Sequence, residues 1–284
     1  MRLLRFFAPD GIVHLGVREE AHVRDLGVRE PLAPLSAQEV ASAPRLPLAG
    51  LRLDAPIRAV PKLLALAGNY HKHVAEAGFA DQHNGVWTPQ IFWKPSTTIL
   101  APSASIPIRS NNVFFDWEAE LAVVIGRRVK DISVENAMDV VFGYTIINDL
   151  SERKFNSTIE GRDKRDFDPF FDWLMGKWFD GSAPIGPEIV TADEVPDPHD
   201  LSIRLLLNGE VMQDSNTRHM IIRIPEAIAA LSAVLTLEPG DVIAMGTPEG
   251  VGMARGRALR PGDHMRAEVE SLGALETTIS AEAQ

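Results

Sequence analysis

A succession of short strand-like segments separated by turn residues is the feature that most limits the folds open to this chain. Asn208-Gly209 between two segments is typical of a tight hairpin, and Pro-Gly-Asp turns precede two others. A clear helix is predicted only over residues 225–235, with Pro225 in its first turn. Many strands and few helices favour an α+β protein, mainly β, with a sandwich or barrel-like core. The predicted strands are 63–67, 91–94, 118–125, 144–148, 203–207, 211–213, 242–245 and 265–270.

The N-terminal part of the chain predicts a separate small unit. Residues 1–28 resemble a β-meander, with strands at 3–7 and 12–17 around an Asp10-Gly11 turn. Residues 31–56 are rich in Pro and Ala, with weak periodicity, and predict a connecting arm. We therefore expect a small N-terminal domain and arm over residues 1–56 and a main domain over residues 57–284.

Charge and composition exclude several classes of function. The 28 basic and 39 acidic residues give a net charge of −11, and no Lys/Arg run stands out, so nucleic acid is not an expected partner. An anionic substrate would need local positive groups to hold it. The chain has no cysteine, which excludes disulfides and a thiolate metal site. No apolar run reaches the ~18 residues of a membrane helix, so a cytoplasmic protein without a membrane partner is expected.

Two carboxylates lie on a predicted strand that is apolar on both faces. Because side chains alternate along a strand, Glu118 and Glu120 share a face in the run DWEAELAVVIGRR. Paired carboxylates in a buried strand repel each other and lose hydration, and a hard divalent cation neutralises them directly. The alternative is an exposed strand face on which the glutamates pair with Arg127 and Arg128.

Asp149 is a candidate third ligand, because it stands at the tip of the predicted strand that ends in Asn148. Three carboxylates and a divalent cation leave one negative charge, which Lys177 or Arg153 would balance. The alternative for Asp149 is a carboxylate that caps a turn.

A possible acid–base pair precedes these strands. If the residues around His73 are helical, His73 and Glu76 stand three positions apart and face one another. A carboxylate beside an imidazole orients it and raises its basicity, as a general base requires. Two alternatives remain: both are exposed helix residues, or His71 and His73 are metal ligands as in a cupin-like oxygenase.

Four motifs in order, DWEAELAVVIGR, GYTIINDLSER, MGKWFD and AMGTPEGVG, resemble the fumarylacetoacetate hydrolase family from about residue 57 to the C-terminus. LAGNYHKHVAEAG and IFWKP also resemble its pattern. The resemblance implies a mixed β-roll core, a homodimer, and Mg²⁺ or Mn²⁺. It implies metal ligation by Glu118, Glu120 and Asp149.

The resemblance also implies roles for individual residues. Lys177 matches the active-site lysine of the family, and the His73–Glu76 pair matches a lid segment that activates water. Substrate-binding positions are implied at Lys94, Arg153, Gly246 and Thr247. Two departures concern the substrate: Asn156 stands where the family often has Gln, and the segment between Asp149 and Lys177 is long and rich in Phe.

These features predict an enzyme that acts on a small 2-oxo acid. The expected reaction is hydrolysis of a C–C bond in a 2,4-dioxo acid, of acylpyruvate or diketo sugar acid type, through a metal-stabilised pyruvate enolate. Decarboxylation of an oxaloacetate-type diacid and isomerisation of a hydroxydienoate are alternatives on the same scaffold. A binding protein without catalytic activity is a more distant alternative.

Overall fold

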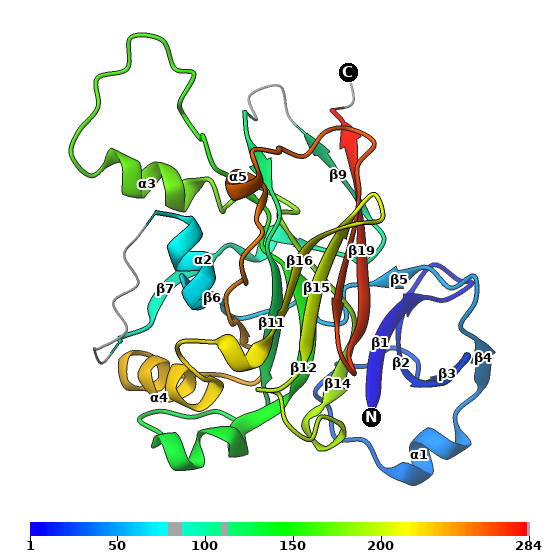
Figure 1. Ribbon diagram of the computed structural model, residues 1–284. Coiled ribbons are helices and arrows are strands. Elements are labelled where there is room, and N and C mark those ends of the chain that lie inside the picture. The colour runs from blue at the N-terminus through cyan, green and yellow to red at the C-terminus, as the bar shows by residue number, and fades with distance from the viewer. Residues whose placement is uncertain (79–86, 109–112, 283–284) are drawn as a thin grey trace.

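The computed structural model describes residues 1–78, 87–108 and 113–282. Two mixed β-sheets dominate it, and the helices are short (Figure 1). This architecture confirms the predicted fold class. None of the helices in the described ranges has the length and apolar character needed to cross a membrane.

The larger sheet carries the site. Its strands run in the order β4 (Arg45–Pro47), β3 (His22–Asp25), β2 (Val13–Glu19), β1 (Arg2–Phe7), β14 (Ala183–Thr191), β12 (Val141–Asn148), β11 (Ala119–Ile125), β17 (Val242–Ala244), β6 (Leu63–Ala67) and β7 (Gln90–Lys94). Two short strands join it beside this path, β5 (Leu53–Asp54) on β1 and β8 (Ile99–Leu100) on β14. β11 lies in the middle of the sheet, hydrogen-bonded to β12 and β17.

The second sheet covers one face of the first. It has the order β16 (Glu210–Asn216), β15 (Ser202–Leu207), β18 (His264–Val269), β19 (Gly273–Ala281) and β9 (Ser105–Ile108). Asn208 and Gly209 form the β15–β16 turn with positive φ angles, as their hairpin signal predicts. A two-stranded ribbon, β10 (Phe115–Asp116) with β13 (Ser151–Glu152), lies at the start of β11.

The helices lie outside the sheets. They are α1 (Ala37–Ser42), α2 (His71–Glu76), α3 (Asp168–Met175), α4 (Ile224–Val234) and α5 (Gly252–Arg255). Four 3-10 turns accompany them, at Ser96–Thr98, Val134–Val140, Ala192–Glu194 and Thr217–His219. The helix predicted at 225–235 is α4, displaced by one residue.

The alternation of β11 sorts its side chains into two cores. Leu121, Val123 and Ile125 pack in the core shared with the second sheet, which also takes Ile203 and Met265. Ala122 and Val124, on the face predicted for the glutamates, belong to the core on the opposite side of the large sheet. The strand is thus buried on both faces, which contradicts the alternative of an exposed glutamate face.

The N-terminal region is more regular than its sequence indicates. β1, β2 and β3 form the predicted meander, but residues 31–56 contain α1, β4 and β5 where a connecting arm was expected. β4 and β5 extend the sheet on β3 and β1, and β1 pairs with β14 of the main body. These strands are only two or three residues long, so local periodicity could not reveal them. The division into two domains stays a prediction.

Candidate active site

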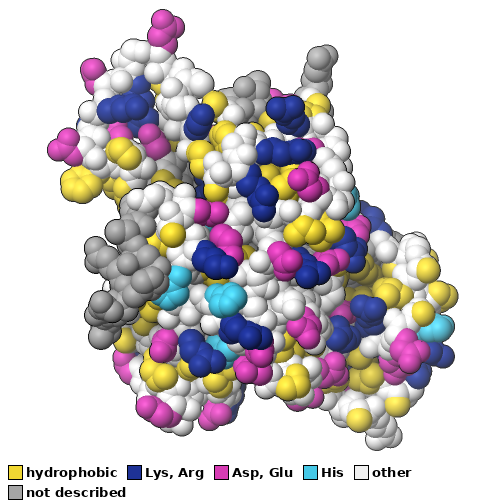
Figure 2. Space-filling view, viewed as in Figure 1, with side chains coloured by type: hydrophobic (Ala, Val, Ile, Leu, Met, Phe, Trp, Pro, Cys, Tyr) yellow, Lys and Arg dark blue, Asp and Glu magenta, His cyan; other side chains and the backbone are white. Residues whose placement is uncertain are grey.

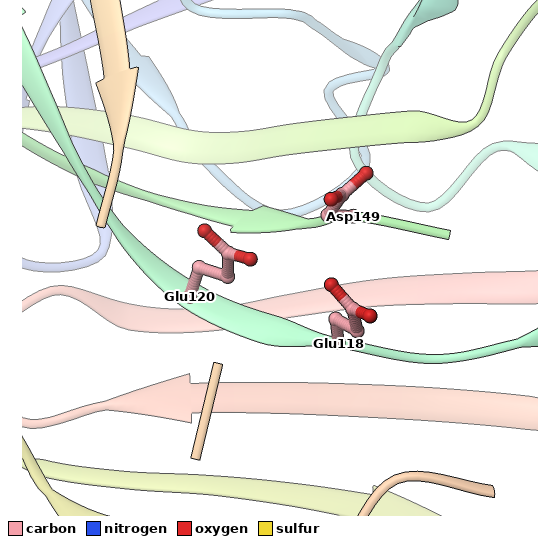
Figure 3. A group of neighbouring side chains, drawn as sticks. All are labelled: Glu118, Glu120 and Asp149. Atoms are coloured by element: carbon pink, nitrogen blue, oxygen red, sulfur yellow. The ribbon is translucent and has the colours of Figure 1, made fainter. Parts of the chain in front are cut away.

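Three buried carboxylates meet where β11 and β12 lie side by side (Figure 3). The antiparallel register pairs Ala119 with Asn148, so Glu118 and Asp149 are neighbours, and the Asp149 amide donates to the Glu118 carbonyl at 2.9 Å. One oxygen from each of Glu118, Glu120 and Asp149 lies within 4.8 Å of the other two. Within the described residues, only this group of His, Asp or Glu side chains has the spacing of a metal site. His71 and His73 are not in it, which disfavours the cupin-like alternative.

Lys177 bridges two of the three carboxylates. Its buried ammonium donates to Glu118 Oε2 and Asp149 Oδ2, both at 2.7 Å. Burial acts to lower the pKa of Lys177, but the Asp149 and Glu118 charges outweigh it and raise that pKa. The lysine is therefore a fixed positive charge at the cluster, as predicted from its motif.

Lys94 holds the other side of Asp149, and its role in substrate binding stays a prediction. Its side chain is 0 % exposed, and the ammonium donates to Asp149 Oδ1 and to the Lys177 carbonyl at 2.5 Å, and to Ser182 Oγ at 3.2 Å. Three acceptors use all three hydrogens of an ammonium. Lys94 thus positions Asp149 and the Lys177 backbone.

Arg153 links the cluster to a fourth buried carboxylate, Asp116. The Arg153 guanidinium donates to Asp116 Oδ2 at 2.8 Å and forms an ion pair with Glu118. Asp116 also accepts from the amides of Gly252 and Met253 at 2.6 and 3.0 Å, so it fixes the start of α5. Burial favours the neutral form of Glu118, but Arg153 and Lys177 outweigh it and hold the pKa of this carboxyl well below its usual range.

Asp116 is a site residue that the sequence analysis missed. Every second position in this run carries a carboxylate, at Asp116, Glu118 and Glu120. The strand alternation that placed the two glutamates on one face therefore also places Asp116 there.

Glu120 has a different environment from the other two ligand candidates. Its Oε2 accepts from the Gly246 amide at 2.7 Å, whereas Glu118 and Asp149 accept from cationic side chains. Burial, together with the Asp149 and Glu118 charges, raises the pKa of Glu120 well above its usual range. In its ionised form this carboxylate is the least compensated charge of the cluster.

The donor set and the charge balance both fit a divalent cation. Hard cations such as Mg²⁺ and Mn²⁺ take carboxylate oxygens, and Glu118, Glu120 and Asp149 supply one each. When Glu120 is ionised, four carboxylates including Asp116 face three cationic groups, Lys94, Lys177 and Arg153, so one negative charge is left over. A divalent cation would turn this into one positive charge, which suits an anionic substrate.

Gly246 and Thr247 shape the loop after β17. Gly246 has φ +82°, and a Cβ there would come within 2.7 Å of the Asn69 Cβ atom. The Thr247 hydroxyl donates to the Ala119 carbonyl at 2.9 Å and accepts from Gln213 Nε2 at 2.8 Å. Both residues support β11 in the structure, and their contact with a substrate stays a prediction.

Gly246→Ala is expected to destabilise the protein more than an alanine at an open glycine with the same backbone strain. An alanine at positive φ costs about 1–2 kcal/mol, and overpacking against Asn69 adds about 1–3 kcal/mol. Gly262→Ala is the matched control, because Gly262 has φ +92° and a Cβ there would meet nothing within 4 Å. Urea unfolding of both variants measures the difference, and equal losses would contradict the close approach at Gly246.

The His73–Glu76 pair forms on α2, as the spacing predicts. His73 Nδ1 lies 2.8 Å from Glu76 Oε1, and Glu76 Oε2 accepts from the Gly250 amide at 2.8 Å. The glycine-rich loop therefore fixes the carboxylate that orients the imidazole. His73 is also close enough to Glu118 to help to lower the pKa of that carboxyl. One loop thus contacts both the acid–base pair and the carboxylate cluster, because the Gly250 amide donates to Glu76 and the Gly246 amide donates to Glu120.

Asn156 and the long segment after it are linked to each other by polar contacts with α3. Asn156 has φ +58° and donates to Asp172 Oδ1 of α3 at 2.9 Å. Arg162 pairs with the same aspartate at 2.6 Å. Asn156 is therefore used to hold α3.

Comparison with known proteins agrees with this geometry. Residues 62–280 match the model of the fumarylacetoacetate (FAA) hydrolase C-terminal family. This match covers most of the chain, and the chain belongs to the fumarylacetoacetate hydrolase family.

Relatives within the family carry different activities in their names. An oxaloacetate tautomerase, fahd2, from Xenopus laevis mitochondria is 34% identical over 98% of this chain and 90% of its own length. The structure of 5-carboxymethyl-2-hydroxymuconate delta-isomerase from Mycobacterium smegmatis has a TM-score of 0.79 at 33% identity, covering 99% of this chain and 100% of that one. Maleylpyruvate hydrolase from Sphingobium sp. SYK-6, solved with manganese(II) and pyruvate, has a TM-score of 0.76 at 28% identity, and each chain is covered completely. The chain is thus similar to a tautomerase, an isomerase and a hydrolase.

Proposed function

We propose that this protein is a divalent-cation-dependent hydrolase that cleaves a C–C bond in a 2,4-dioxo acid, of acylpyruvate or diketo sugar acid type. The observation that carries the proposal is a buried three-carboxylate cluster bridged by Lys177, with the His73–Glu76 pair beside it. The manganese and pyruvate in the maleylpyruvate hydrolase structure support the same class of chemistry.

The residues around the cluster have separate tasks in this reaction. Glu118, Glu120 and Asp149 would hold the cation, Mg²⁺ or Mn²⁺, which when bound supplies a Lewis acid for the 2-oxo acid end of the substrate. Lys177 provides a fixed positive charge where negative charge develops. Lys94 and Arg153 keep Asp149 and Glu118 in place through their ion pairs.

The His73–Glu76 pair provides the general base. Because Glu76 occupies the Nδ1 side, the Nε2 atom of His73 remains to take a proton from water. The resulting hydroxide attacks the C4 carbonyl, and the C3–C4 bond breaks with its electron pair on C3. The carbanion at C3 is the enolate of pyruvate, and a proton returned to C3 gives pyruvate and a carboxylic acid.

Tautomerisation, isomerisation or decarboxylation of a 2-oxo diacid is the second candidate. The names of the Xenopus tautomerase and the mycobacterial isomerase favour it. Each of these reactions needs the enolate but no attacking water. The carboxylate cluster and Lys177 would therefore keep their roles, and His73 would only transfer a proton.

A substrate panel separates the candidates. With Mg²⁺ or Mn²⁺, we expect an acylpyruvate to give pyruvate and the matching carboxylic acid by product mass, with activity lost in EDTA and restored by the cation. Oxaloacetate is the control substrate, because it is a 2-oxo acid without a hydrolysable C4 carbonyl. Its turnover is assayed as CO₂ release and as keto–enol conversion. Turnover of oxaloacetate alone would favour the second candidate, and no turnover of any 2-oxo acid would contradict both.

A further inference from the structure

α2 carries His73 and Glu76, but its own residues hold it only weakly. It has six residues, and a helix of this length is not stable alone in water. None of these six residues, all within the described range 1–78, is buried, and no side chain caps the start of the helix. α2 lies at the surface (Figure 1), and Figure 2 shows histidine side chains exposed on this face of the molecule. The position of α2 therefore depends on contacts at its two ends.

Asn69 holds the start of α2. It lies between β6 and α2 and is buried, with 2 % of its surface exposed. Its Nδ2 atom donates to the Ile222 carbonyl at 3.0 Å and to the Met245 carbonyl at 2.8 Å, and its Oδ1 atom accepts from the Ile222 amide at 2.7 Å. The Asn69 carbonyl accepts from the Ile221 amide at 2.8 Å. Both side-chain hydrogens and the side-chain oxygen are thus in use, a pattern that needs a carboxamide.

The bond from Asn69 to Met245 joins the start of α2 to the loop that supports the carboxylate cluster. Met245 follows β17, and its own amide donates to the Leu121 carbonyl of β11 at 2.9 Å. The next residue is Gly246, whose amide donates to Glu120. The side chain of Asn69 is therefore bound one residue away from the backbone group that holds Glu120.

The same loop also holds the end of α2. The Gly250 amide donates to Glu76 Oε2 at 2.8 Å, and Trp117 Nε1 donates to the Gly250 carbonyl at 3.1 Å. With Asn69 before its first turn and Glu76 in its last, α2 is attached to one loop at both ends. His73 lies between these two points, so the loss of either attachment would free the imidazole to move relative to the cluster.

We propose that Asn69 is a positioning residue that fixes His73 relative to Glu120. It acts through the backbone of the loop and of the residues before α4, since its three side-chain hydrogen bonds all go to main-chain atoms. The consequence for catalysis rests on the proposed function, in which His73 is the general base of hydrolysis. Such a base must lie within hydrogen-bond reach of the water that it activates, and a displacement of about 1 Å can cost about 10²-fold in rate.

Asn69→Leu and Asn69→Ala test this role in kinetics. Leu fills the space of the carboxamide without its hydrogen bonds, and Ala gives a second variant should Leu fail to fold. With saturating Mn²⁺, we expect kcat for hydrolysis of acetylpyruvate to fall by about 10²-fold. Decarboxylation of oxaloacetate needs no activated water and should fall much less. If both rates fall by the same factor, Asn69 serves only stability and the proposal is wrong.

Ser232→Ala is the matched control for a buried polar residue. Ser232 is 0 % exposed near the end of α4, where its Oγ atom accepts from the Ile132 amide and donates to the Ala229 carbonyl, both at 3.0 Å. This variant should lose stability and keep the wild-type ratio of the two rates. A wild type that does not hydrolyse acetylpyruvate would contradict the proposed function, and the attachment of α2 is then decided by a measurement that needs no reaction.

Spin labelling provides that measurement. The chain has no cysteine, and the Lys72 side chain is 74 % exposed, so Lys72→Cys places a single nitroxide on α2. We expect the electron paramagnetic resonance spectrum of an ordered helix with Asn69 present, and the same spectrum when Ser232→Ala is added. Asn69→Leu or Asn69→Ala should shift most of the label to a fast-moving population. A spectrum that neither Asn69 substitution changes would overturn the proposal, whatever reaction the protein catalyses.

Discussion

Lys177→Met is expected to lower kcat by at least about 10²-fold on an acylpyruvate, because it removes a preorganised positive charge beside the developing enolate. The variant should also be less stable without a cation. Glu118 and Asp149 would each lose an ammonium at 2.7 Å, and breaking a buried ion pair from one side costs about 3–5 kcal/mol. Mg²⁺ should recover much of this stability, since it compensates the same carboxylates. Steady-state kinetics and thermal unfolding with and without Mg²⁺ measure both effects.

Lys62→Met is the matched control for this experiment. Lys62 Nζ lies 2.7 Å from Oδ2 of the buried Asp241, the residue that precedes β17. Lys62 is not part of the carboxylate cluster. We expect it to lose stability without rescue by Mg²⁺ and to keep the wild-type kcat. If Lys177→Met turns over like the wild type, Lys177 has no part in the chemistry.

His73→Ala and Glu76→Ala are expected to separate hydrolysis from decarboxylation. Loss of a general base costs about 10²–10⁴-fold, and only hydrolysis needs an activated water. Acylpyruvate hydrolysis should fall by at least the lower end of this range, whereas oxaloacetate decarboxylation should fall much less. Both rates are measured for each variant at saturating cation.

Lys72→Ala, on the same helix, controls for general damage to α2. Its side chain is exposed and pairs with Glu249 at 3.2 Å, an interaction of small energy. It should behave like the wild type in both reactions. An equal fall of both reactions in the His73 and Glu76 variants would assign the pair to substrate binding, and unchanged rates would leave it as a surface feature.

The ligand candidates could be predicted from sequence because a strand has a fixed side-chain period. Alternation alone put Glu118 and Glu120 on one face, and the end of an apolar run put Asp149 at a strand tip. The His73–Glu76 contact followed from helical spacing in the same way. These predictions needed only residues that are close in sequence.

The role of Lys94 could not be predicted in this way. Lys94 lies at the end of β7, which pairs with β6, and β6 in turn pairs with β17. These strand pairings bring Lys94 into contact with Asp149, which is 55 positions further along the chain. The ion pairs of Arg162 with Asp168 and Asp172 were equally hidden, because strand alternation does not reveal contacts between a loop and a helix.

The amount of Mn²⁺ bound per chain tests the central claim most directly. It can be counted by electron paramagnetic resonance on protein that has been stripped of metal and titrated with Mn²⁺. We expect one ion per chain in the wild type and loss of this binding in Glu120→Gln. Glu188→Gln, at a buried glutamate that pairs with Arg2 instead, should bind like the wild type. No bound Mn²⁺ in the wild type, or unchanged binding in Glu120→Gln, would contradict a cation site at Glu118, Glu120 and Asp149.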